Sequence, residues 1–132
     1  MAIPRAFASF FFFLFLASPL CTMANNLIYS GGTLKSGESL KAGDYEFIMD
    51  EDCSLALFHK ETQEWNSGTD RLGLNCYLSF DSYANLTIYD GDNLLLFRIG
   101  LDLDKGQYVL ILQETGRLAK ARGIIKQLEE II

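Results

Sequence analysis

Histidine is nearly absent from this chain, and most arrangements on which catalysis depends are absent with it. Among 132 residues there is one histidine, His59, and no cluster of cysteines or acids accompanies it. A metal site or a Ser–His–Asp triad needs several such groups within reach of one another. The sequence also shows no nucleophile beside a base and no glycine-rich phosphate loop. We therefore predict a protein that is not an enzyme and that uses no metal or other cofactor.

Positive charge is also scarce. The chain holds 11 Lys and Arg residues against 17 Asp and Glu residues, which gives a formal net charge of −6. Binding to nucleic acid or to an anionic membrane requires basic patches. The composition therefore argues against both partners.

Only one long apolar run is present, and it lies at the N-terminus. Residues 6–20 read AFASFFFFLFLASPL, with Arg5 before them and the small residues Thr22 and Ala24 after them. The run is short for a membrane span, and the pattern is that of a signal peptide. We expect residues 1–24 to be cleaved after Ala24 and the protein to be secreted to an extracellular or vacuolar location. A retained membrane anchor is the alternative.

Cysteine is sparse but informative. Cys21 leaves with the predicted signal peptide, so two cysteines remain, Cys53 and Cys76. In an oxidising compartment two remaining thiols are expected to pair. We predict a Cys53–Cys76 disulfide.

One hairpin pattern occurs three times in the remaining chain. The stretches 45–58, 76–89 and 107–121 each read as a strand, a short polar turn and a second strand. Their equivalent apolar positions are Phe47, Leu78 and Leu110; Met49, Phe80 and Leu112; and Leu55, Leu86 and Leu118. Short strands at regular spacing favour an all-β sandwich, barrel or prism. Because no unit can bury its apolar face alone, we predict three similar sheets around a shared apolar centre.

The C-terminal tail breaks this pattern. Residues 124–132 place isoleucine and leucine at helical spacing, with Lys126, Glu129 and Glu130 between them. The spacing predicts a short amphipathic helix, and a frayed terminus is the alternative.

Roughly residues 25–118 resemble the monocot mannose-binding, or bulb-type, lectins. The resemblance is carried by the opening NNLIYSGGTLKSGESLKAGDYEFIMDEDCSLALF, by EWNSGTD and GQYVLILQ, and by the spacing of Cys53 and Cys76. It implies a β-prism of three four-stranded antiparallel sheets with pseudo-threefold repeats, formed by a domain over residues 25–123. It also implies that Trp65, and Phe97 from another sheet, fill the apolar centre.

In that family each sheet can carry a mannose site with the pattern Gln-x-Asp-x-Asn-x-Val-x-Tyr. Amide, carboxylate and phenol groups supply the donors and acceptors that sugar hydroxyls need. The three equivalent stretches here are 50–58, 81–89 and 113–121, and none of them keeps the whole pattern. The matching residues, which the resemblance makes the carbohydrate-binding candidates, are Asp52, Asn85, Tyr89 and Gln113.

Asn85 has a second interpretation. It begins Asn-Leu-Thr, an acceptor sequence for N-linked glycan in a secreted chain. Its expected position in the middle of a strand disfavours this use, and a glycan there would block the best-kept sugar site.

Two functions follow from the resemblance. The first is a secreted, non-catalytic lectin that binds mannose-type glycans or glycoproteins weakly, in plant defence or storage. The alternative is a lectin-fold protein that has lost mannose binding and acts by protein contact or as a storage protein. Members of the family form dimers by exchanging C-terminal strands. A homodimer is in doubt here, because Ala121 replaces the aromatic residue that ends the third site.

Overall fold

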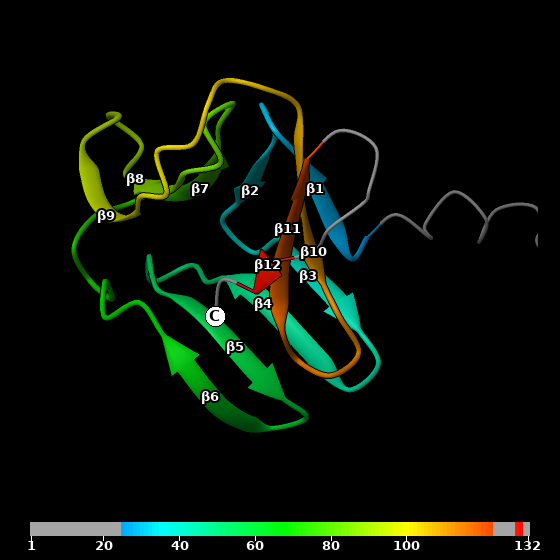
Figure 1. Ribbon diagram of the computed structural model, residues 1–132. Helices are drawn as coiled ribbons and strands as arrows, with labels where there is room; N and C mark the ends of the chain where they lie inside the picture. Colours follow the sequence, from blue (N-terminus) through cyan, green and yellow to red (C-terminus); the bar gives the residue numbers. More distant parts are fainter. Residues whose placement is uncertain (1–24, 123–128, 131–132) are drawn as a thin grey trace, which may run out of the picture.

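The structure has the predicted architecture of three four-stranded antiparallel sheets (Figure 1). It is a computed structural model that describes residues 25–122 and 129–130. We name the sheets by their strand order: sheet A is β1-β10-β11-β12, sheet B is β2-β7-β8-β9 and sheet C is β3-β4-β5-β6. The strands are β1 (Leu27–Tyr29), β2 (Thr33–Lys35), β3 (Ser39–Ala42), β4 (Tyr45–Met49), β5 (Leu55–His59), β6 (Thr62–Asn66), β7 (Tyr77–Phe80), β8 (Leu86–Tyr89), β9 (Leu95–Ile99), β10 (Tyr108–Leu112), β11 (Leu118–Arg122) and β12 (Glu129–Glu130).

The first three strands each enter a different sheet. β1 pairs with β10, β2 pairs with β7 and β3 pairs with β4. The rest of each sheet comes from one repeat: its hairpin (β4–β5, β7–β8 or β10–β11) and the strand that follows. The N-terminal segment therefore completes all three sheets.

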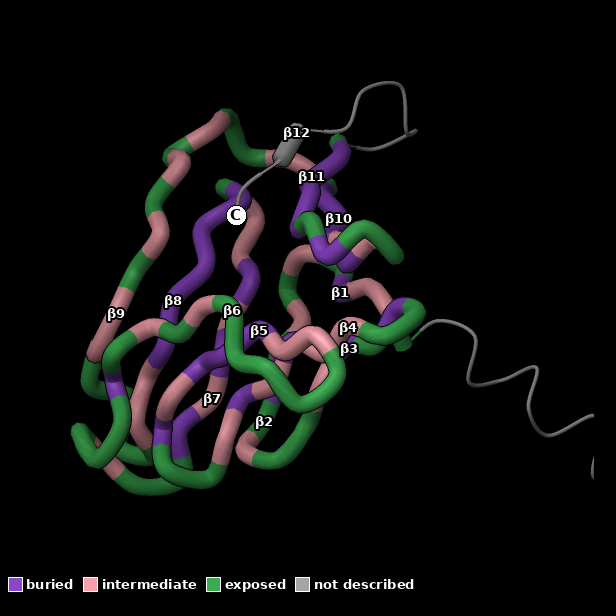
Figure 2. The backbone as a smooth tube through the Cα atoms, turned by 90° about the horizontal axis from the view of Figure 1, so that it is seen from below, coloured by how far each residue is buried: buried purple, intermediate pink, exposed green. Residues whose placement is uncertain are grey.

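The apolar repeat positions form the common core. The nine equivalent residues that the sequence predicts to face inward are each at most 1% exposed. Figure 2 shows buried stretches on strands of all three sheets, whereas the exposed residues gather in the connecting turns. The alternation expected of a half-buried strand is clear in β2, β3 and β7, whereas β5, β8, β10 and β11 are buried at consecutive residues.

Two aromatic residues from different sheets meet beside this core, as predicted. Trp65 of β6 and Phe97 of β9 pack edge to face, with ring centroids 6.3 Å apart. Both are partly buried against the core cluster. Trp65 also lies near the Phe47 ring of its own sheet. Its contact with Phe97 therefore joins sheet C to sheet B.

The predicted disulfide is confirmed. Cys53 and Cys76 are bonded across a sequence separation of 23 residues. Cys53 lies in the turn before β5 and Cys76 directly precedes β7. The bond therefore ties sheet C to sheet B.

The predicted C-terminal helix is wrong where the tail is described. Glu129 and Glu130 form β12, which pairs with Lys120 and Ala119 of β11. An open sheet edge presents unpaired backbone groups, and pairing with β12 satisfies part of that edge. Residues 123–128 and 131–132 lie outside the described residues, as does the predicted signal peptide. Over the described ranges, no helix is long and apolar enough to cross a membrane.

Candidate carbohydrate-binding face

The first three positions of the pattern in each repeat lie in a turn that all three sheets share. The turns are 50–54, 81–85 and 113–117, and each closes with two backbone hydrogen bonds of the same kind. The fourth residue of each turn has a positive φ: 78° at Cys53, 62° at Ala84 and 85° at Gly116. The continuous strand that the alternation of residues 78–89 suggests is therefore broken at 81–85. Asn85 directly precedes β8 and is not in the middle of a strand.

In the turn of sheet C, Asp52 is bound within the turn itself. Its Oδ1 accepts hydrogen bonds from the Ser54 backbone N–H at 2.9 Å and from the Ser54 hydroxyl at 2.7 Å. These two bonds favour the ionised form and lower the pKa of Asp52 below its ordinary value. The carboxylate is otherwise exposed, so it keeps acceptor capacity toward solvent.

In the turn of sheet B, Asn85 is 4% exposed and serves as a clamp. Its Oδ1 accepts hydrogen bonds from the backbone N–H groups of Leu101 and Asp102, at 2.8 and 2.9 Å. Its Nδ2 donates to Asp102 Oδ1 at 3.2 Å. The amide thus holds the segment after β9 against the start of β8.

The same network contains an ion pair. Arg98 of β9 lies 2.6 Å from Asp102 Oδ1 through its Nη2. The Arg98 hydrogen bond, followed by that from Asn85, lowers the pKa of the Asp102 carboxyl below its ordinary value. Both side chains are largely exposed, so the pair positions the loop and adds little stability of its own.

The geometry of the Asn85 side chain is unfavourable for the predicted glycosylation. The atom that would carry a glycan is Nδ2, which the folded protein directs to Asp102. A glycan attached there would have to displace that bond and open the loop. The prediction stays untested, and the buried amide argues against its use.

Tyr89, the last position of the pattern in sheet B, lies on the outer face of the sheet. Its ring stacks on that of Tyr77, with centroids 5.5 Å apart and planes inclined by 28°. The Tyr77 hydroxyl donates to Asn93 Oδ1. Lys35 is the Cα partner of Tyr77, and Tyr77 that of Tyr89. Residues directly opposite on antiparallel strands share a face, so these three form a row across β2, β7 and β8.

Polar and aromatic groups dominate this outer face of sheet B. The residues that alternate with the core positions on its four strands are Thr33, Lys35, Tyr77, Ser79, Thr87, Tyr89, Leu95 and Arg98. Thr87 is 4% exposed and Arg98 is paired with Asp102, so the groups left for a ligand are the other hydroxyls, the Lys35 ammonium and the tyrosine rings, which suit the hydroxyls and the apolar edge of a sugar ring.

The third equivalent stretch, residues 113–121 of sheet A, has no comparable polar and aromatic outer face. Gln113 lies in the turn of sheet A, but the next outward positions on β11 are Ala119 and Ala121, which are at most 2% exposed. The opposite residues on β10 are Ile111 and Val109. No hydrogen-bonding side chain follows Gln113 on these two strands' outer face.

The four sequence candidates are thus distributed over three sheets. Asp52 belongs to sheet C, Gln113 to sheet A, and only Asn85 and Tyr89 lie in the same sheet. The sequence reasoning missed Tyr77, Arg98 and Asp102. Tyr77 could have been found, because a hairpin whose turn is 81–85 places residue 77 opposite residue 89. The roles of Arg98 and Asp102 depend on the path of the loop, which leaves no such signal.

The amino-acid sequence is similar to those of several mannose-specific lectins. The chain is 40% identical over 81 residues to the mannose-specific lectin of Galanthus nivalis. This alignment covers 61% of this chain and 51% of that protein. It is 30% identical over 95 residues to the mannose-specific lectin of Aloe arborescens, covering 71% of this chain and 87% of that protein. The chain spans about half the length, or less, of the first curated relatives it matches. No family model matches.

The fold is also similar to solved structures of mannose-binding lectins. The snowdrop (Galanthus nivalis) mannose-specific agglutinin, in complex with methyl-α-D-mannoside, superposes with a TM-score of 0.71 at 35% identity. The alignment covers 74% of this chain and 90% of the agglutinin chain. These proteins are lectins and not enzymes, as the sequence predicts for this chain. The shared β-prism, the disulfide and the identity over nearly the whole Aloe lectin show that this chain belongs to the monocot mannose-binding, or bulb-type, lectins.

Proposed function

We propose that this protein is a non-catalytic lectin that binds mannose-type glycans weakly on the outer face of sheet B. The observation that carries the proposal is the position of Tyr89 on that face, at the end of the strand that follows the Asn85 turn, where its ring stacks on Tyr77. Among the described residues, sheet B is the sheet that holds two of the four matching pattern residues, Asn85 and Tyr89. Membership of a family whose relatives are mannose-specific supports the choice of sugar.

Weak binding follows from the state of the pattern. Tyr83 replaces the central carboxylate, and the Asn85 amide is already satisfied by the loop. Each hydrogen bond that is lost at a sugar hydroxyl costs roughly 0.5–1.5 kcal/mol, or about two- to tenfold in affinity. We expect a single site of millimolar strength, so detection will depend on ligands with several mannose groups.

A lectin fold without mannose binding is the second candidate. The Asn85 clamp favours it, because the loop already uses the acceptor capacity of the amide oxygen and one of the two Nδ2 donors. Such a protein would act by protein contact or as a storage protein.

We further propose a secreted protein in defence or storage, on the strength of the predicted signal peptide and the disulfide. The edge of β11 is paired with β12 of the same chain, so strand exchange between two copies would require β12 to be displaced. We therefore expect a monomer.

A mannose-glycan array with matched variants tests the proposal. Tyr89→Ala should abolish the signal of the wild-type protein. Phe58→Ala, the equivalent change in sheet C, should leave it unchanged. Absence of binding by a wild-type protein that is shown to be folded would reject mannose binding and leave the second candidate. Equal loss in both variants would place the site elsewhere.

A further inference from the structure

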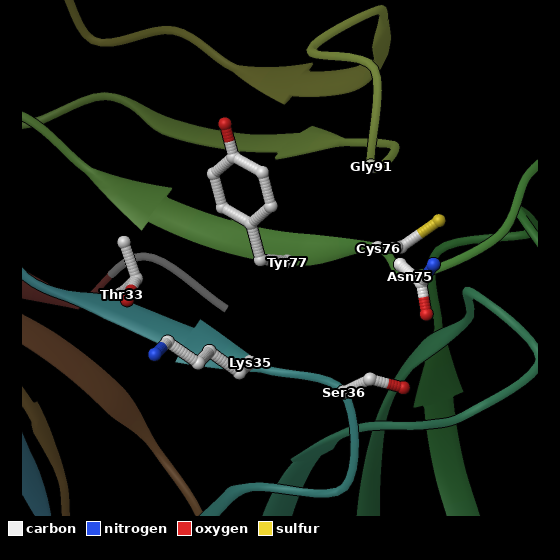
Figure 3. A pocket seen from close by; sticks show the side chains of 7 residues that line it. All are labelled: Thr33, Lys35, Ser36, Asn75, Cys76, Tyr77 and Gly91. Carbon is white, nitrogen blue, oxygen red and sulfur yellow. The ribbon is translucent and has the colours of Figure 1, made fainter.

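A pocket with Tyr77 in its wall lies on the same side of sheet B. It has a volume of about 490 Å³ and is lined by residues of β2, of the start of β7 and of the turn before β9: Thr33, Lys35, Ser36, Asn75, Cys76, Tyr77 and Gly91 (Figure 3). None of these residues belongs to the mannose pattern. The volume lies in the range of small-molecule sites, which is about 300–1,000 Å³.

The pocket has the wall composition of a sugar site. Tyr77 supplies an aromatic ring, and Figure 3 shows it rising from β7 with Thr33 and Lys35 on the neighbouring strand. Thr33, Ser36 and Asn75 add hydroxyl and amide groups, which can both donate and accept hydrogen bonds. An aromatic ring with neutral polar groups around it suits a pyranose, which has an apolar face and a rim of hydroxyls.

The charge of the pocket sets it apart from a neutral sugar site. Lys35 is its only charged lining residue. Among the described residues the Lys35 ammonium forms no ion pair, which is also true of Lys60 and Lys105, but of these three only Lys35 lines the pocket. The nearby Glu38 carboxylate accepts the Lys35 backbone N–H at 2.7 Å instead. A cation without a partner, in a pocket without acids, favours a ligand that carries negative charge.

We propose that this pocket binds a pyranose bearing a carboxylate, with the Lys35 ammonium contacting the carboxylate and the Tyr77 ring forming the apolar wall. The row of Lys35, Tyr77 and Tyr89 spans three strands, or about 10 Å at the usual strand spacing. That length fits two linked sugar units. An acidic unit at Lys35 can therefore adjoin a neutral unit at Tyr89.

The test uses the full chain and a matched pair of ligands. One is an oligosaccharide of uronic acid units, and the other is the same oligosaccharide with its carboxylates reduced to alcohols. We expect the acidic ligand to bind about fivefold more tightly at low salt, a difference that is lost at high salt. Lys35→Gln should remove this preference and leave binding of the reduced ligand unchanged. Tyr77→Ala should weaken both ligands, whereas Tyr77→Phe should weaken neither by more than about twofold.

Lys41→Gln is the control, because it removes the same charge from an exposed lysine of sheet C. The proposal is overturned if Lys41→Gln lowers acidic-ligand binding as much as Lys35→Gln does, or if the two ligands bind equally. Failure of a folded wild-type protein to bind the acidic ligand at millimolar concentration also overturns it. The mannose array reports on the Tyr89 site through Tyr89→Ala and Phe58→Ala, so its outcome is distinct from the preference for the acidic ligand that Lys35→Gln tests.

Discussion

Sheets A and B have the same backbone arrangement, but the side chains on their outer faces differ in chemical character. Both have four strands, the same turn in the central hairpin and a β-strand from the N-terminal segment at one edge. On sheet B the outward positions are mostly hydroxyl, basic or tyrosine side chains. On sheet A the outward positions of β1, β10 and β11 are Leu27, Tyr29, Val109, Ile111, Ala119 and Ala121.

This difference separates what the fold needs from what a binding site needs. The inward residues are mostly apolar in both sheets, with Lys120 opposite Leu110 as a charged exception in sheet A, because each sheet must contribute to one shared core. The outer face carries fewer buried residues, although Ala119 and Ala121 of sheet A are at most 2% exposed, so its exposed positions can change with less effect on the fold. A chain can therefore belong to a lectin family while its individual sites are kept, altered or erased.

The shared core should be equally sensitive in the two sheets. Phe80 of sheet B and Leu112 of sheet A occupy equivalent positions and are both 0% exposed. We expect Phe80→Ala to lower the free energy of unfolding by about 3–5 kcal/mol and Leu112→Ala by about 2–5 kcal/mol. Urea denaturation measures both. A small effect at either position would mean that its sheet is not part of the common core.

The disulfide joins sheets B and C and leaves sheet A untouched. Replacing both Cys53 and Cys76 by alanine should destabilise the protein by about 3 kcal/mol, the value expected for a loop of this length. Because the three sheets share one core, hydrogen exchange should show all of them losing protection together. Protection that persists in sheet A alone would show that it folds independently.

The Asn85 clamp is specific to sheet B. Asn85→Ala removes the acceptor of two part-buried backbone donors, those of Leu101 and Asp102, and at about 0.5–1.5 kcal/mol for each lost hydrogen bond should cost about 1–3 kcal/mol. Ser54→Ala is the control at the equivalent turn position of sheet C. It should cost less than about 1 kcal/mol, because Ser54 bonds only to the exposed Asp52. Equal costs, measured by thermal unfolding, would contradict the clamp.

The smallest expected effect is on the stability of the fold at acidic pH. Asp52 and Asp102 have pKa values that are lower in the folded protein than in the unfolded chain. Their contribution to stability is therefore present above about pH 4 and is lost as the pH falls through their folded pKa values. The double variant Asp52→Asn, Asp102→Asn should show a shallower loss of stability than the wild type over this acidic range. An unchanged slope would assign the acid sensitivity to other carboxylates.

The sequence predicts the fold better than it predicts the site. The core positions repeat every 31 or 32 residues, and burial of apolar side chains makes that repeat visible. The turn at 81–85 was harder to place, because the residue with positive φ there is Ala84, not the glycine that such a conformation favours. Its equivalent Gly116 does carry the signal, so aligning the repeats could have shown that Asn85 ends a turn.

The role of the Asn85 side chain could not be predicted from the pattern. Asparagine suits a sugar hydroxyl and a backbone N–H equally well. Which one it meets depends on where residues 100–106 lie, and that path is set by tertiary packing. For the same reason the Lys35 pocket has no counterpart in any local motif, since its residues come from three separate segments.

The distribution of the first three strands has a consequence for biosynthesis. Sheet C comes from residues 39–66, so all of its strands are synthesised in one stretch. Sheet B must wait until β7 to β9 are available to β2, and sheet A must wait until β10 reaches β1. We expect the sheets to assemble in the order C, B, A, with the N-terminal strand β1 left unpaired until almost the whole chain has emerged. During that interval the first of the described strands to be made is the last to find its partner in a sheet.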